Sequence, residues 1–134
     1  MGLVVDPSAI LGLAMADEAA DYASAVLAEI ERSGAQVPSI FWYEIRNVLV
    51  VNERRGRITE DQTDDFLASL AELSIDVLPL PSELAVLDLA RGYRLSVYDA
   101  AYLELARRGD ARLATLDRGL RSAASEAGVA VFGL

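Results

Sequence analysis

The chain has 134 residues, of which 53% are hydrophobic and 25% charged, so we expect one folded domain over residues 1–134. Its formal net charge is −9, and it contains no His, no Cys and no Lys, because all 12 basic residues are Arg. These absences exclude disulfides, thiolate nucleophiles, imidazole bases, imidazole or thiolate metal sites and Schiff-base lysines.

The first half of the chain alternates short apolar runs with helical patterns. Pro7 suits the first turn of a helix, and Thr59 with Gln62 forms a capping-box pattern that opens another. The elements predicted here are a strand over 3–6, helices over 7–14 and 17–32, a strand over 36–38, and helices over 39–55 and 60–73.

The second half continues this alternation. Its predicted elements are a strand over 75–79, helices over 82–90 and 97–108, a strand over 113–115, a helix over 117–126 and a strand over 129–132. Strands that alternate with helices favour right-handed crossovers. We therefore expect an α/β fold, with a short, mostly parallel five-stranded sheet between two helical layers.

Four of the 21 acids stand in unusual positions, whereas most others, Glu29 among them, fit the polar faces or first turns of helices. Asp6 and Asp117 follow predicted strands, at the sheet edge where ligands bind, although each also suits a helix cap. Glu44 and Asp99 lie on apolar helix stripes, where a carboxylate must pair with an arginine or bind a metal. Converging carboxylates favour a hard cation such as Mg²⁺ or Mn²⁺.

Four stretches around these acids form an ordered pattern: Val4–Ala9, Tyr43–Leu49, Tyr98–Ala106 and Leu113–Asp117. Together they resemble the four acidic motifs of PIN-domain ribonucleases, and most closely the VapC-type toxin of VapBC toxin–antitoxin modules. The likeness covers essentially the whole chain. Its most specific part is the Asp-Ala-Ala-Tyr-Leu block that begins at Asp99. The resemblance implies a PIN-like three-layer α/β/α fold and a metal-dependent endoribonuclease that uses Mg²⁺, with Mn²⁺ as a substitute.

The resemblance also implies roles for particular residues. The catalytic and metal-binding acids would be Asp6, Glu44, Asp99 and Asp117. The residues that orient carboxylates or water would be Ser8, Asn47 and Thr115. The implied partners are an RNA substrate, a small VapB-like antitoxin whose basic residues enter the acidic pocket, and a second copy of the chain. The helices over 17–32 and 60–73 are candidate dimer surfaces.

Two stretches, 46–57 and 107–121, are locally basic within this acidic chain. Because guanidinium groups bind phosphate through two parallel hydrogen bonds, we expect RNA phosphate contacts from Arg46, Arg118 and Arg121. Arginines at helix ends equally suit solvated positions next to the helix dipole.

Two other functions suit the same fold. A phosphorylation-switched, receiver-like signalling domain also carries acids at strand ends, but it uses a lysine that this chain lacks. A non-catalytic acidic interaction module would bind a basic partner through the same carboxylates. No uncharged run approaches the length of a membrane helix, so we expect a cytoplasmic protein.

Overall fold

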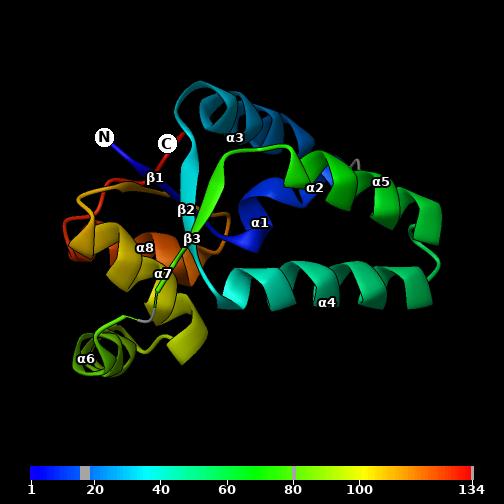
Figure 1. The fold of residues 1–134 in the computed structure, drawn as a ribbon. Helices are drawn as coiled ribbons and strands as arrows, with labels where there is room; N and C mark the ends of the chain where they lie inside the picture. The colour runs from blue at the N-terminus through cyan, green and yellow to red at the C-terminus, as the bar shows by residue number, and fades with distance from the viewer. Residues whose placement is uncertain (16–18, 80, 134) are drawn as a thin grey trace.

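The computed structural model describes residues 1–15, 19–79 and 81–133, which form a sheet between helices (Figure 1). The strands run parallel in the order β3-β2-β1-β4. They are β1 (Leu3–Val5), β2 (Ala35–Pro38), β3 (Ile75–Leu78) and β4 (Arg112–Ala114). All three residues of β1 are buried, because this strand lies inside the sheet and is covered on both faces.

Helices cover both faces of the sheet (Figure 1). On one side lie α1 (Pro7–Ile10), α2 (Gly12–Met15), α3 (Ala20–Ser33) and α5 (Glu60–Ala71). On the other side lie α6 (Glu83–Tyr93), α7 (Val97–Arg108) and α8 (Arg118–Glu126). Helix α4 (Ile40–Arg54) begins after β2 and extends outward beside α5. The predicted three-layer α/β/α fold with a parallel sheet is confirmed.

The predicted fifth strand over 129–132 is reduced to one parallel bridge, between Leu113 and Val131. Leu113 also donates a backbone hydrogen bond to Ala130 and accepts one from Phe132. The chain then turns at Gly133, whose φ is 76°, so the pairing extends no further. The sheet of the described residues therefore has four strands rather than five.

The predicted helix over 7–14 is divided into α1 and α2. At Gly12 the chain comes so close to the next segment that a Cβ would lie 2.7 Å from backbone atoms of Ala19. Glycine is therefore the residue that lets α2 pack here. The predicted start of the next helix at Asp17 lies outside the described residues, and α3 is described from Ala20.

The capping box predicted at the start of α5 is present. The Thr59 N–H donates to Gln62 Oε1 at 2.8 Å, and the Gln62 N–H donates to Thr59 Oγ1 at 3.1 Å. These two bonds satisfy backbone donors that the first turn of a helix leaves without partners. No described helix is both long enough and apolar enough to cross a bilayer.

The expectation that Glu29 lies on a polar helix face is wrong. Its side chain is buried against β4, where Arg32 and Arg112 donate to Glu29 Oε1 at 2.6 and 2.8 Å. The hydrogen bonds from Arg32 and then Arg112 lower the Glu29 pKa to about 2. This cluster ties α3 to β4, a contact that helical periodicity does not reveal.

Candidate active site

Asp6 is the most deeply buried of the four predicted site acids, at 5% exposure. It follows β1 directly and caps α1, where its Oδ1 accepts a hydrogen bond from the Ala9 N–H at 3.3 Å. Two hydroxyl groups also donate to its carboxylate: Ser8 to Oδ1 at 2.6 Å and Thr115 to Oδ2 at 2.5 Å. The carboxylate therefore has one fixed orientation.

Ser8 and Thr115 join the ends of β1 and β4 through this carboxylate. Ser8 Oγ accepts from the Leu116 N–H at 2.9 Å, and Thr115 Oγ1 accepts from the Asp117 N–H at 3.1 Å. Each hydroxyl thus receives a backbone hydrogen bond and donates its own proton to Asp6. The network brings the first and fourth acidic motifs together at one edge of the sheet.

Glu44 projects from α4 and is held by α7. The hydroxyl of Tyr102 donates to Glu44 Oε1 at 2.7 Å. Glu44 is half-buried, because the most buried face of α4 is formed by other residues: Phe41, Ile45, Leu49 and Asn52. The predicted apolar stripe around Glu44 is therefore the margin of the buried face rather than its centre.

Asp99 lies in the first turn of α7, close to the other three acids. Its N–H donates to Ser96 Oγ at 3.0 Å, which caps the helix. The charge of Asp99 disfavours ionisation of Asp6 and of Glu44, and the charge of Asp117 disfavours ionisation of Asp99. Asp117 caps α8, where its Oδ1 accepts from the Leu120 N–H at 2.8 Å. Asp6 and Asp117 therefore both cap helices and lie near Asp99.

Burial and mutual repulsion make three of these carboxyl groups hard to ionise. Burial is the main cause for Asp6, and it raises the pKa to about 6 despite the hydrogen bonds from Ser8, Thr115 and Ala9. Burial followed by the charge of a neighbouring acid also raises the pKa of Asp99. For Glu44 burial again raises the pKa, and the hydrogen bond from Tyr102 opposes it. Negative charge at this edge is therefore incompletely compensated.

A divalent cation suits the chemistry of these side chains, although they are not arranged to hold one as they stand. The ion pairs found in the described part of the chain involve Glu29 and Glu104 and none of the four site acids. Among the same residues, no three acidic side chains form a ready metal-binding group. The donors are all oxygen atoms, which hard cations prefer. Metal binding would therefore require Glu44, Asp99 or Asp117 to turn toward Asp6.

Comparison with known proteins shows the family to which the chain belongs. The family model described as PIN domain matches residues 3–126. The chain belongs to the PIN domain family. It is 35% identical to Ribonuclease VapC3 of Pyrobaculum aerophilum over 124 residues, which cover 90% of this chain and 92% of that protein. Its fold is similar to the crystal structure of PAE2754 from Pyrobaculum aerophilum, with a TM-score of 0.72, 28% identity and coverage of 92% and 86% of the two chains.

Tyr102 of this PIN domain contacts the candidate site, and the sequence analysis did not include it. Because Tyr102 follows Asp99 by three residues, the sequence pattern indicated only that it belongs to an apolar helix stripe. The side chain is 1% exposed, and burial followed by the hydrogen bond to Glu44 raises its pKa, so the hydroxyl keeps its proton and donates. A tyrosine rather than phenylalanine at so apolar a position was the available signal.

The remaining predicted residues of the PIN domain lie in different surroundings. Asn47 is exposed on α4. Arg46 donates to the Trp42 carbonyl at 3.1 Å and stacks on the Trp42 ring at 3.8 Å from its centroid. Arg121 donates through Nε to the Thr115 carbonyl at 2.8 Å. Arg118 is exposed beside Asp117, so of the three predicted RNA-contacting arginines it has the least engaged guanidinium.

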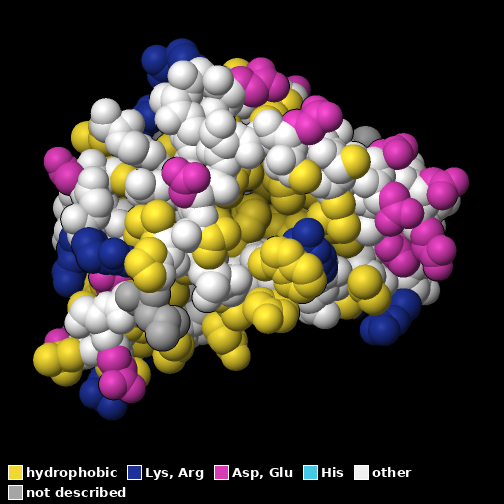
Figure 2. Space-filling model, viewed as in Figure 1, with side chains coloured by type: hydrophobic (Ala, Val, Ile, Leu, Met, Phe, Trp, Pro, Cys, Tyr) yellow, Lys and Arg dark blue, Asp and Glu magenta, His cyan; other side chains and the backbone are white. Residues whose placement is uncertain are grey.

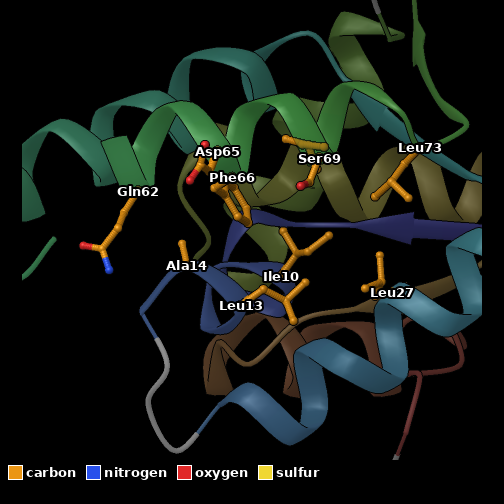
Figure 3. A pocket seen from close by; sticks show the side chains of 10 residues that line it. Ile10, Leu13, Ala14, Leu27, Gln62, Asp65, Phe66, Ser69 and Leu73 are labelled. Atoms are coloured by element: carbon orange, nitrogen blue, oxygen red, sulfur yellow. The ribbon is translucent and has the colours of Figure 1, made fainter. Parts of the chain in front are cut away.

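Hydrophobic side chains of the PIN domain line two hollows that are separate from the four site acids. Figure 2 shows them around the hollow between β3 and α4, where a pocket of about 170 Å³ includes Trp42 and Arg46. A larger cavity of about 390 Å³ lies between α2, α3 and α5. Leu13, Leu27 and Phe66 point into it from three different helices (Figure 3). None of the four site acids lines either cavity, so both are separate from the acidic edge.

Proposed function

We propose that this PIN domain is a Mg²⁺-dependent endoribonuclease and the toxin of a type II toxin–antitoxin pair, with Mn²⁺ as a substitute cation. The observation that carries the proposal is the set of four carboxylates from four separate elements around Asp99. Burial raises the pKa of Asp6, Glu44 and Asp99, and within the described residues none of the four acids forms an ion pair with an arginine. Such groups are characteristic of functional sites. Similarity to a protein named Ribonuclease VapC3 supports RNA as the substrate.

In this proposal the four acids have different roles in binding the cation. Asp6 is the fixed ligand, because Ser8 and Thr115 orient both of its oxygens. Glu44 is the adjustable ligand, oriented by Tyr102 at one oxygen and exposed enough to turn. Asp99 and Asp117 complete the set at the helix starts. A bound Mg²⁺ would supply an activated water and compensate negative charge on the phosphodiester.

The surrounding residues would orient water and substrate. Ser8 and Thr115 hold the Asp6 carboxylate, and Asn47 on the exposed side of α4 is placed to meet water or substrate. Contacts with RNA phosphates are proposed for Arg118, and for Arg46 and Arg121 if the substrate displaces their present hydrogen bonds.

The proposed partners follow from the same site. Basic side chains of a VapB-like antitoxin would compensate the charge of the acidic edge and displace the cation. We also propose a homodimer and a cytoplasmic location. A VapB-like protein encoded beside this chain should abolish RNA cleavage when it is added, whereas full cleavage in its presence would contradict the antitoxin role.

The proposed nuclease is tested with total cellular RNA incubated with Mg²⁺, with Mn²⁺ and with chelator. We expect the wild-type protein to cleave RNA only with a divalent cation and Asp99→Asn to cleave none, while both keep the same circular dichroism spectrum. Asp64→Asn, which changes an exposed acid on α5, is the matched control and should cleave like the wild type.

Two results would contradict the nuclease assignment. If Asp99→Asn protein cleaves RNA at the wild-type rate, Asp99 is not part of the catalytic site. A wild-type protein that takes up phosphate from acetyl phosphate and cleaves no RNA would favour the receiver-like alternative. The PIN family match argues for the nuclease over that alternative.

A further inference from the structure

Most of the 12 arginines already have a hydrogen-bond partner or lie at helix ends away from the acidic edge. Those in ion pairs are Arg32, Arg108 and Arg112. Those bound to a backbone carbonyl are Arg46 and Arg121. Those at or just after the distant end of α4 are Arg54, Arg55 and Arg57. Arg107 lies in the last turn of α7. The arginines that remain are Arg91, Arg94 and Arg118, and in the described part of the chain none of these forms an ion pair.

Two of these arginines line a polar pocket of about 330 Å³ between the end of α6 and one face of α8. Arg91 and Arg94 belong to the α6 side, and Gly119 and Ser122 belong to the α8 side. Glu126, the last residue of α8, also lines the pocket, at the end of that helix away from Asp117. Two arginines and a serine therefore line the pocket together with a single acid.

The pocket adjoins the acids through both of its walls. Helix α6 packs along α7 and leads into it at Arg94, five residues before Asp99. Gly119 follows Asp117 by two residues, and a Cβ at Gly119 would lie 3.3 Å from Asp117 Oδ1. Figure 1 shows α6, α7 and α8 together on one side of the sheet. A strand that passes the acids can therefore continue into the pocket.

Arg94 occupies an unusual backbone conformation. It ends α6 with φ 57° and ψ 41°, in the left-handed region where glycine is the common residue. The Leu95 N–H donates to the Ala90 carbonyl at 3.0 Å, which closes the helix end. Because glycine would satisfy the same backbone with less strain, the helix end itself gives no reason for a guanidinium here.

We propose that this pocket binds a phosphodiester group of the RNA strand beside the bond that is cut, with Arg91 and Arg94 as the donors. The inference rests on the proposed function. The four carboxylates repel a phosphate backbone, so substrate binding requires positive charge close to them. A guanidinium presents two parallel N–H groups to phosphate, a geometry that suits this ligand.

The unusual backbone of Arg94 allows a variant that removes charge without weakening the helix end. The test compares Arg91→Gln/Arg94→Gly with Arg54→Gln/Arg55→Gln, which removes the same charge at the distant end of α4. Both pairs are made in an Asp99→Asn background, and binding of a fluorescein-labelled single-stranded RNA is measured by polarisation over a range of salt concentrations. Cleavage is measured in parallel with Asp99 intact.

We expect the Arg91/Arg94 variant to bind RNA about tenfold more weakly, with its melting temperature at or above that of the parent protein. The plot of log affinity against log salt concentration has a negative slope, and this slope should become shallower by about 0.7 for each phosphate that the variant no longer neutralises. The Arg54/Arg55 variant should keep both the affinity and the slope. Equal effects in the two variants, or none in either, would overturn the proposal.

Two further outcomes distinguish the roles that this pocket could have. If the wild-type protein cleaves no RNA under any condition, the proposed function fails, while the binding comparison still decides whether the pocket holds RNA. If the Arg91/Arg94 variant keeps its RNA affinity but loses binding to poly-glutamate, the phosphodiester assignment is overturned in favour of an acidic peptide.

Discussion

Replacing Asp6 with Asn tests whether a buried carboxylate is maintained at the expense of stability. Burial raises the pKa of Asp6 from 3.8 to about 6, beyond what its hydrogen bonds from Ser8 and Thr115 offset. A tenfold change in proton affinity corresponds to about 1.4 kcal/mol, so the ionised group destabilises the folded chain by about 3 kcal/mol. Between these two pKa values the folded chain binds more protons than the unfolded chain, and its stability falls as pH rises.

Asparagine keeps the shape of the aspartate and removes its charge. Its amide oxygen can accept from Ser8 and the Ala9 N–H as Asp6 Oδ1 does, and its NH₂ group can donate to Thr115 Oγ1. We expect Asp6→Asn to match the wild type near pH 4. By about pH 8 it should be up to about 3 kcal/mol more stable in the free energy of unfolding.

The assay is urea unfolding followed by circular dichroism, in chelator, from about pH 4 to pH 8. Asp64→Asn is the control, because a change at an exposed acid of α5 should alter stability by less than about 0.5 kcal/mol at every pH. A difference between Asp6→Asn and the wild type that is constant with pH, or an Asn variant that is less stable at high pH, would refute the reasoning.

Three further predictions follow from the same contacts. Tyr102→Phe removes a hydrogen bond to Glu44 that is worth about 1.5–3 kcal/mol, so we expect single-turnover cleavage to be about tenfold slower. Because this bond lowers the Glu44 pKa, the acid limb of the pH–rate profile should move to higher pH, and an unchanged profile would contradict this. Millimolar Mg²⁺ should increase the free energy of unfolding of the wild type, by about 2.7 kcal/mol at a hundredfold excess over Kd, and so raise its melting temperature in calorimetry. The melting temperature of Asp99→Asn should not change, and an equal rise in both proteins would contradict a cation site at Asp99. Thr115→Val should reduce the free energy of unfolding by about 1–3 kcal/mol in urea titrations, because Asp6 Oδ2 loses its donor; a loss below about 0.5 kcal/mol would count against the network.

Much of the fold could be predicted because its main signals are local. Alternation of apolar runs with helical patterns predicted the parallel sheet and its two helical layers. The capping box at Thr59 was predicted from two residues of the correct types and is present. The division between α1 and α2 and the shortened fifth strand depend on how neighbouring segments pack, and periodicity does not encode that packing.

In the candidate site, too, the residues with local sequence signals could be predicted and the contacts between distant segments could not. Asp6 and Asp117 could be located because strand ends meet at one edge of a parallel sheet, and Asp99 because its helix face is apolar. The hydrogen bond from the Tyr102 hydroxyl could not be predicted because its partner, Glu44, is 58 residues away in sequence. Glu29 was misplaced for the same reason, since Arg112 is 83 residues distant.

The hydrogen bonds that fix Asp6 have a consequence for synthesis of the chain on the ribosome. Thr115 is 109 residues beyond Asp6, and the Leu116 N–H is 108 residues beyond Ser8. A nascent chain that already contains β1, α4 and most of α7 therefore still lacks the groups that orient its first acid. Contacts so distant in sequence form slowly, so the acidic edge should assemble only after β4 emerges. The proposed nuclease would thus stay inactive for most of its own translation.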